Sequence, residues 1–192
     1  GEGRTLGYGV SVAGLEVEGQ PTQPLYVRHV EPLSPAAALG VQRGDEVLAI
    51  DGRSAYDLIA SNDFSVLTAD VVGEQMTLEL RRNGVPRTVT VSAAVYTLTP
   101  VSGTAVLTTV AGRRLGYVAV KDMIGQALAP MESAFARLKA ERIDDFVLDL
   151  RYNGGGLVST GGTLASYVAG ALASDRRYAT LLYNDKQTDS NQ

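Results

Sequence analysis

The hydrophobic pattern changes partway along the chain, and this change constrains the fold more than any other feature of the sequence. Between residues 6 and 94, short apolar stretches are separated by Gly, Pro, Asp-Gly or Asn-Gly turns, and apolar and polar side chains alternate at 76–81. A period of two predicts strands with one buried face. Later, helical spacings alternate with apolar strands, which is typical of an α/β layer around a mainly parallel sheet. The pattern therefore predicts an α+β or α/β chain, with a β-rich domain at 1–95 and the first part of an α/β domain at 96–192.

The β-rich domain is expected to contain short strands and two helices. The first helix should have Ser34 as its N-cap, Pro35 in its first turn and Gly40 at its end, because these residue types favour those positions. The second helix is expected at about residues 61–69. The expected strands are residues 8–12, 25–30, 46–50, 75–81 and 87–91.

The α/β domain is expected to begin with a hairpin formed by residues 105–110 and 115–120. A helix should follow, because apolar residues recur at spacings of three and four. These residues are Leu128, Met131, Phe135 and Leu138. The nearly continuous apolar run at 146–150 predicts a strand covered on both faces. A further helix should reach about Ala173, and a strand is expected at 178–183.

Composition excludes several classes of function. Among 192 residues, 21 acidic residues outnumber 17 basic residues, giving a formal net charge of −4. This charge disfavours nucleic acid and anionic membranes as partners. The chain has no cysteine and a single histidine, His29, so we expect no metal and no cofactor. His29 is expected to be structural or exposed, because no serine or cysteine motif is placed to use it.

Residues 33–52, LSPAAALGVQRGDEVLAIDG, resemble the signature of a PDZ domain. The preceding Gly7-Tyr8-Gly9-Val10 resembles the carboxylate-binding loop of that family, and the order resembles the permuted PDZ domains of bacterial proteases. A glycine-containing turn can expose successive backbone N–H groups to an anion, and the strand after it can accept an added peptide strand. The resemblance implies a site for exposed, apolar C-termini of proteins or peptides. The residues expected to form it are Tyr8, Gly9, Val10, Val12, Phe64 and Leu67.

Residues 146–156, FVLDLRYNGGG, resemble the Asp-Leu-Arg-x-Asn-Gly-Gly-Gly segment of the carboxyl-terminal processing peptidases. These tail-specific proteases are serine peptidases of the S41 type with a ClpP/crotonase-like core, and their glycine loop lends a backbone N–H to the oxyanion hole. Glycines allow such donors to approach a carbonyl closely, and a following helix N-terminus favours negative charge. The resemblance implies Gly155 as the first candidate donor and Gly156 as the second. Asp149 and Arg151 are expected to stabilise the strand end and the loop.

The serine nucleophile and lysine base of similar enzymes lie downstream of the glycine loop, and neither can be assigned in this chain. Ser159, Ser166 and Ser174 lack the small-residue serine motif of the family, and Lys186 lacks Gly-Lys-Gly surroundings. We therefore expect the chain to stop before both residues and to be inactive alone, as part of a longer serine endopeptidase.

Two other classes of function stay open. A glycine loop between a strand and a helix can hold phosphate, but no Lys-Ser or Lys-Thr follows it as a P-loop requires. A non-catalytic scaffold that recruits C-termini through its PDZ domain is the second alternative. The family resemblance implies a periplasmic or extracellular location, with an envelope anchor as a further alternative, and it leaves substrate identity and oligomeric state open.

Overall fold

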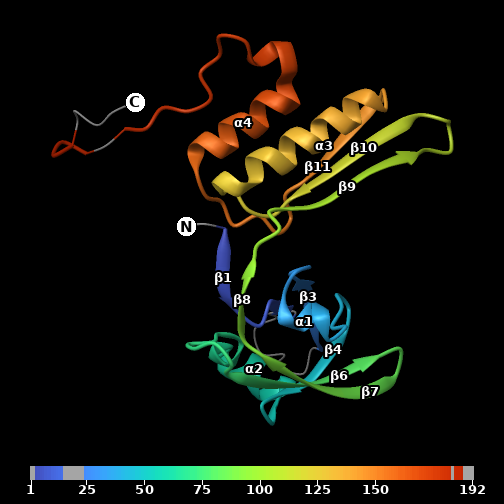
Figure 1. Ribbon diagram of the computed structural model, residues 1–192, viewed down its shortest axis with the longest axis vertical. Helices are drawn as coiled ribbons and strands as arrows, with labels where there is room; N and C mark the ends of the chain where they lie inside the picture. The colour runs from blue at the N-terminus through green and yellow to red at the C-terminus, as the bar shows by residue number, and fades with distance from the viewer. Residues whose placement is uncertain (1–2, 15–23, 183, 188–192) are drawn as a thin grey trace. The chain divides into compact units, whose positions relative to one another are not determined.

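The computed structural model describes residues 3–14, 24–182 and 184–187, and the chain forms two compact units (Figure 1). The first unit is Gly1–Thr99 and the second is Pro100–Gln192. The chain stays in the first unit as far as the strand Ala94–Thr97, because this strand pairs antiparallel with Arg4–Gly7.

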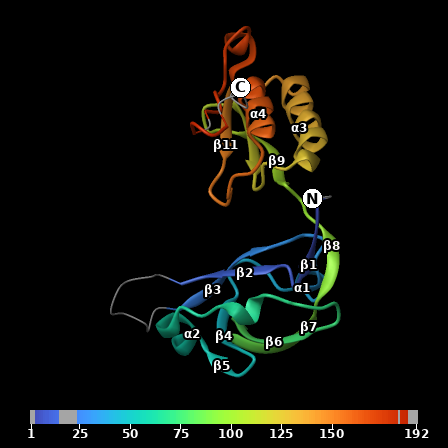
Figure 2. The same cartoon turned by 90° about the vertical axis from the view of Figure 1, so that its left-hand side faces the viewer.

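The first unit is built on an antiparallel sheet in the order β2-β3-β4-β6-β7, with β5 paired to β4 and a separate β1–β8 pair (Figure 2). The strands are β1 (Arg4–Gly7), β2 (Val10–Ala13), β3 (Leu25–Val30), β4 (Glu46–Ile50), β5 (Arg53–Ser54), β6 (Gln75–Arg82), β7 (Val85–Ser92) and β8 (Ala94–Thr97). The alternation predicted at 76–81 is confirmed, because Met76, Leu78 and Leu80 are fully buried. β2 ends the sheet, so one of its edges pairs with no strand of the described residues.

The strand expected at residues 8–12 begins later than predicted, as β2, and a separate strand, β1, precedes it. β1 ends at Gly7 and β2 begins at Val10. Between them, the carbonyl oxygen of Tyr8 accepts the N–H of Ala36 at 3.0 Å, and Gly9 has φ +80°. These features interrupt the extended conformation, which the apolar pattern alone did not reveal.

The first helix is confirmed, whereas the expected position of the second is wrong. In α1 (Pro35–Ala38), the Ser34 hydroxyl oxygen accepts the N–H of Ala37 at 3.2 Å. The second helix, α2 (Ala55–Ser61), lies earlier than residues 61–69, because Ser54 caps its start and Asn62 adopts left-handed angles at its end. Beyond Ser61, the last residue of α2, the expected range contains only a single 3₁₀ turn, η1 (Ser65–Leu67).

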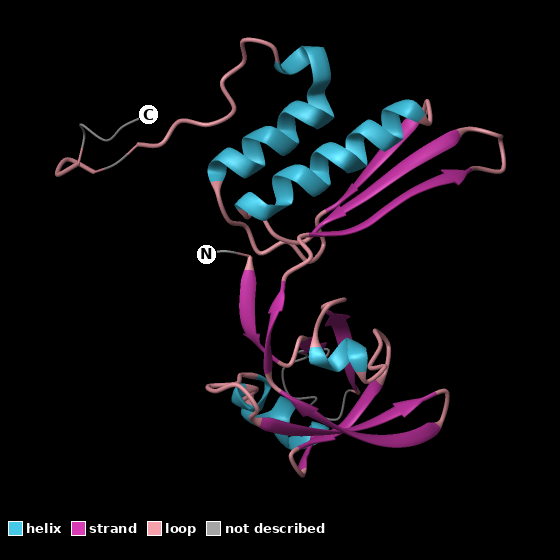
Figure 3. Ribbon diagram, in the orientation of Figure 1, coloured by secondary structure: helices cyan, strands magenta, loops and turns pink. Residues whose placement is uncertain are grey.

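The second unit has a mixed sheet in the order β11-β10-β9, in which β10 is antiparallel to β9 and parallel to β11. Its elements are β9 (Val101–Thr108), β10 (Arg114–Val120), η2 (Gly125–Ala127), α3 (Leu128–Ala140), β11 (Asp145–Asp149), α4 (Val158–Ala169) and η3 (Gly170–Ala173). Figure 3 shows α3 and α4 side by side against one face of the sheet. Met131 and Leu138 of α3 pack with Val118 and Val120 of β10, as the helical spacing predicted.

Two expectations for this unit are wrong. β11 was expected to be covered on both faces, but Val147 is 41% exposed, because the helices of the described residues cover only the face that carries Phe146 and Leu148. The strand expected at 178–183 is absent from residues 178–182, and Tyr183 lies outside the described residues. The ring of Tyr178 instead lies against Gly162 of α4, where an added Cβ would be 3.3 Å from it.

An ion pair between the buried Asp45 and the partly exposed Arg82 links the β4 and β6 ends of the first unit. Asp45 is 1% exposed, and its carboxylate accepts hydrogen bonds from Arg82 Nε at 2.5 Å and from the Gln42 N–H at 2.9 Å. Burial alone would raise the pKa of Asp45, but the Arg82 and Gln42 hydrogen bonds outweigh it and lower the pKa below its usual value. Arg82 also donates to the carbonyl oxygen of Gly40 at 2.8 Å, so it ties the end of β6 to the turn after α1.

Replacing this arginine should destabilise the first unit. Arg82→Met leaves a buried carboxylate without its main partner, so we expect a loss of about 2 kcal/mol in the free energy of unfolding. The matched control is Arg81→Met, whose pair with Glu46 is exposed, and it should cost about 0–1 kcal/mol. Urea unfolding followed by circular dichroism measures both. Because the folded-state pKa of Asp45 is lowered, the ionised carboxylate contributes to the free energy of unfolding. This contribution is complete above the unfolded-state pKa of about 3.9 and is lost as the pH falls through the folded-state pKa. Equal losses in the two variants at neutral pH would contradict this account.

Candidate peptide groove and glycine loop

The turn between β1 and β2 directs backbone N–H groups toward the open edge of the sheet. The carbonyl oxygens of Tyr8 and Gly9 accept N–H groups of Ala36 and Glu31 at 3.0 and 2.8 Å, so both carbonyls point into the domain. In a trans peptide the N–H points opposite to the carbonyl, so the N–H groups of Gly9 and Val10 point the other way. The bond from Glu31 to Gly9 also makes Val10 and Val30 a non-hydrogen-bonded pair, which turns the polar groups of Val10 away from β3.

Gly9 is required at this turn by space as well as by conformation. An added Cβ would lie 1.9 Å from Cβ of Ser34, and φ is +80°. Tyr8, by contrast, contributes its backbone to the turn and its side chain to the core, where it is 2% exposed. Burial of the ring raises the pKa of the Tyr8 hydroxyl, and the nearby Glu74, Asp51 and Asp70 raise it further. The hydroxyl is therefore neutral at physiological pH.

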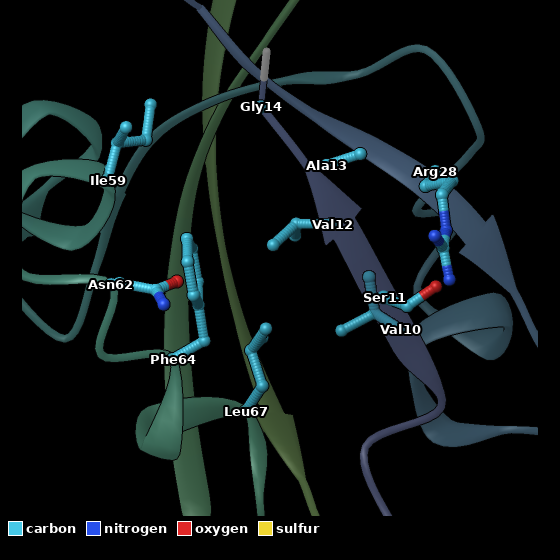
Figure 4. Close-up of a pocket in the computed structure, with 10 residues that line it drawn as sticks. All are labelled: Val10, Ser11, Val12, Ala13, Gly14, Arg28, Ile59, Asn62, Phe64 and Leu67. Carbon is cyan, nitrogen blue, oxygen red and sulfur yellow. The ribbon is translucent and has the colours of Figure 1, made fainter. Parts of the chain in front are cut away.

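A cavity of about 450 Å³ lies between β2 and the α2–η1 segment (Figure 4). It brings together four residues expected at the peptide site, namely Val10, Val12, Phe64 and Leu67. Ser11 and Ala13 also line it, on the stretch 10–13 that was expected to pair with a peptide. The lining residues that the sequence reasoning missed are Gly14, Arg28, Ile59 and Asn62. Ile59 was missed because the second helix was placed too late in the chain; the Ser54 cap motif followed by Asp57 was the signal that could have located it.

The side of the groove formed by Phe64 and Leu67 is held by a network around Asp63. The carboxylate of Asp63 accepts the hydroxyl and the N–H of Ser65 at 2.6 and 3.0 Å, and it pairs with Arg53 at 2.8 Å. These bonds, with the Ser65 hydroxyl first, lower the pKa of Asp63 to about 2. Asp63 therefore stays ionised and holds the turn that carries Phe64 toward β2.

The end of β11 carries a fixed cluster before the glycine loop. The hydroxyl of Tyr117 donates to Asp149 at 2.6 Å, and the guanidinium of Arg151 donates to the same carboxylate at 2.6 Å. The backbone N–H of Arg151 adds a bond of 3.0 Å. The Arg151 bonds, followed by that of Tyr117, hold the pKa of Asp149 well below its usual range. This cluster fixes the direction in which the chain leaves the sheet.

Asn153 fastens the glycine loop to the end of β10. Its side-chain amide donates to the carbonyl oxygen of Val120 at 3.1 Å, and its side-chain oxygen accepts the N–H of Gly155 at 2.7 Å. The Gly155 N–H, the first candidate donor from the sequence, is therefore already engaged. The N–H of Gly156 makes no hydrogen bond to the part of the chain that the structure describes.

Gly156 lies against the backbone that follows β10. The N–H of Met123 donates to the Gly155 carbonyl at 3.0 Å, and the N–H of Leu157 donates to the Met123 carbonyl at 2.6 Å. A Cβ on Gly156 would lie 2.3 Å from that Met123 oxygen, whereas the space beside Gly155, with φ +99°, is open within 4 Å. α4 begins at Val158, so its N-terminus follows the loop directly.

Other expected features are also located. His29 lies on β3 with its Nε2 3.3 Å from Glu31 Oε1. Within residues 3–14, 24–182 and 184–187, no group of three or more His, Cys, Asp or Glu side chains is arranged to hold a metal ion. No helix of those residues is long and apolar enough to cross a membrane.

Comparison with known proteins assigns the two units. Residues 6–93 match the model of the PDZ domain, and residues 114–192 match the model of peptidase family S41. The first unit thus matches a PDZ domain and the second matches a segment of peptidase family S41, so the resemblance found in the sequence is confirmed.

Its relatives include carboxyl-terminal processing enzymes. The chain is 28% identical to a chloroplastic C-terminal processing peptidase of Tetradesmus obliquus, over 81% of this chain and 36% of that protein. It is also 28% identical to a carboxyl-terminal-processing protease of Synechocystis sp., over 79% of this chain and 36% of that protein. The chain therefore spans little more than a third of the length of these relatives.

Solved structures confirm the α+β fold class. A putative S41 protease from Bacteroides fragilis superposes with a TM-score of 0.66 and 23% identity, over 98% of this chain and 51% of that chain. A photosystem II D1 C-terminal processing protease superposes with a TM-score of 0.54 and 24% identity, over 86% of this chain and 44% of that chain.

The two glycines of the loop should respond differently to alanine. Gly156→Ala forces the Met123 carbonyl to move, so we expect a loss of about 3 kcal/mol in the free energy of unfolding of the second unit. Gly155→Ala has only backbone strain to overcome and should cost about 1 kcal/mol. Urea unfolding measures both losses, and hydrogen exchange of the Leu157 amide should accelerate only in Gly156→Ala. A larger effect of Gly155→Ala on both measurements would contradict the described packing.

Proposed function

We propose that this chain is the substrate-capturing portion of a carboxyl-terminal processing serine endopeptidase. The observation that carries the proposal is the edge of β2 that pairs with no described strand. This edge lies beside an apolar groove, next to a turn that directs backbone N–H groups to the same edge. These are the components needed to add a peptide strand and to hold its terminal carboxylate. The S41 segment and the processing enzymes among the relatives support the peptidase half of the proposal.

In this proposal the captured C-terminus lies along β2. Its carboxylate is held by the N–H groups of Tyr8, Gly9 and Val10, and the preceding residues run along β2 in the antiparallel direction. The apolar terminal side chain enters the groove among Val12, Phe64 and Leu67. Strand pairing supplies affinity for many sequences, while the groove selects an apolar end.

Binding should depend on the free carboxylate. A fluorescein-labelled hexapeptide ending in valine should bind the 192-residue chain about tenfold more tightly than its C-terminal amide, because the amide loses charge-assisted hydrogen bonds. Phe64→Ala should weaken binding of the free acid by removing one wall of the groove. The matched control is Tyr56→Ala, which removes an exposed ring of α2 that does not line the cavity. Fluorescence anisotropy gives the affinities, and equal values for acid and amide would sink the carboxylate role of the turn.

The glycine loop is proposed to supply one backbone donor to the oxyanion hole. Such a donor must face the oxygen that becomes negatively charged when the nucleophile attacks the carbonyl carbon. Gly156 is the stronger candidate, because Asn153 accepts the Gly155 N–H. The N-terminus of α4 adds a field that favours this negative charge. The serine nucleophile and the lysine base are left to residues outside this chain.

The two glycines can be separated kinetically in the full-length protein. Gly156→Ala should lower kcat and kcat/KM together by about 10²–10³, because the collision with the Met123 carbonyl moves the Gly156 N–H away from the oxygen that it would stabilise only in the transition state. Gly155→Ala should keep kcat within about threefold. Peptide binding and circular dichroism check that each variant is folded. A loss of 10² or more in a folded Gly155→Ala would return the role of donor to Gly155, and a full-length protein without peptidase activity would favour the scaffold alternative.

We also propose a periplasmic or extracellular location, which only the family resemblance supports. The proposed partners are proteins or peptides with exposed, apolar C-termini. Cell fractionation with an antibody against this chain tests the location, and recovery in the cytosol alone would contradict it.

A further inference from the structure

The outer side of β2 and β3 carries a cationic residue close to the open edge. Along β3, Leu25 and Val27 are buried while Tyr26 and Arg28 are exposed, so Arg28 points away from the core. On β2, Val10 and Val12 pack toward the core, and alternation directs Ser11 to the same outer side as Arg28.

The register of the two strands places Arg28 beside Ser11. Ser11 is paired with His29 and Val12 with Val27, with a register shift between the two pairs. Arg28 therefore lies between the partners of Ser11 and Val12. Figure 4 shows its side chain extending along the outer side of β2 toward Ser11, and both residues line the cavity.

A peptide paired with β2 would present alternate side chains to this outer side. Its last and third-from-last side chains face the groove, so the penultimate and fourth-from-last side chains face outward. A peptide strand would lie roughly 10 Å from β3, two strand spacings away. Arg28 spans part of this distance, because it lines the same cavity as the residues of β2.

The charge of the cavity wall favours an acidic side chain at these positions. Among the described residues that line the cavity, Arg28 is the only one with a charge. Guanidinium groups carry five N–H donors in a fork that fits a carboxylate. Arg28 can therefore donate hydrogen bonds to a peptide carboxylate in addition to any partner that it already has. None of the cavity-lining residues that the structure describes is a carboxylate that would repel an acidic peptide, although the chain as a whole has a net charge of −4.

We infer that Arg28, with Ser11, forms a specificity subsite that selects C-terminal tails with an aspartate or glutamate at the penultimate or fourth-from-last position. This inference rests on the proposed binding of C-termini along β2. It extends that proposal from an apolar terminal residue to a two-part signal, in which the groove reads the last side chain and Arg28 reads a carboxylate on the opposite side of the same tail.

The test uses the 192-residue chain and two sets of fluorescein-labelled hexapeptides with a free C-terminal valine. The first set has glutamate, glutamine or lysine at the penultimate position, and the second has them at the fourth-from-last position. In at least one set, the glutamate peptide should bind about two- to fivefold more tightly than the glutamine peptide. This preference should shrink in about 0.5 M NaCl, because the pair is solvent-exposed.

Variants assign the preference to Arg28. Arg28→Ala should abolish it, and Arg28→Glu should make the lysine peptide the tightest ligand of the set. Arg43→Ala, which removes an exposed arginine that does not line the cavity, should keep the preference. Circular dichroism checks the fold of each variant, and the wild-type comparison needs no variant at all.

The outcomes separate this inference from the proposal beneath it. Equal affinities of the glutamate and glutamine peptides in both sets would overturn the Arg28 subsite, as would a preference that survives in Arg28→Ala. If free-acid binding still exceeds amide binding in that case, the carboxylate site stands without the subsite. If acid and amide peptides bind equally, the carboxylate site itself is wrong.

Discussion

The close approach of Gly9 to Ser34 is the contact on which the binding edge depends. A Cβ at Gly9 would overlap Ser34, so only glycine lets the turn sit against the start of α1. That contact allows the carbonyls of Tyr8 and Gly9 to be satisfied inside the domain, and the geometry of the trans peptide then turns the following N–H groups outward. The carbonyl oxygens of the turn are thus hydrogen-bonded within the domain, while its N–H groups face outward, where a ligand can reach them.

In the second unit, side chains hold the glycine loop in place. Asp149 and Asn153 each accept or donate bonds that hold the chain after β11, and Met123 is bonded on both sides of Gly156. Several bonds on a short segment leave the loop few conformations. A preorganised loop keeps the Gly156 N–H in a fixed orientation, which is the condition that the proposed oxyanion-hole role requires of a backbone donor.

The sequence predicted features that depend on local chemistry and missed those that depend on distant partners. The strands at 25–30 and 46–50 were placed to the residue, because turn residues bound them on both sides. The second helix was predicted too late in the chain, at 61–69. The apolar residues of that range were given more weight than Ser54, which caps the start of the helix. The need for glycine in the loop could be read from the sequence, but the capture of the Gly155 N–H could not. An asparagine side chain can bond to many neighbours, and only the folded backbone decides which.

The shortness of β2 limits how long a peptide can stay bound to it in the proposed binding mode. A strand of four residues with a register shift in its middle offers few backbone hydrogen bonds to a partner. Affinity differences between related complexes arise mostly from dissociation rates, so the proposed binding of a tail along this short edge implies a brief residence time. The shortness of β2 also lowers the risk of aggregation between copies of the chain. Short, irregular edges are poor templates for the sheet-to-sheet association that long open edges promote.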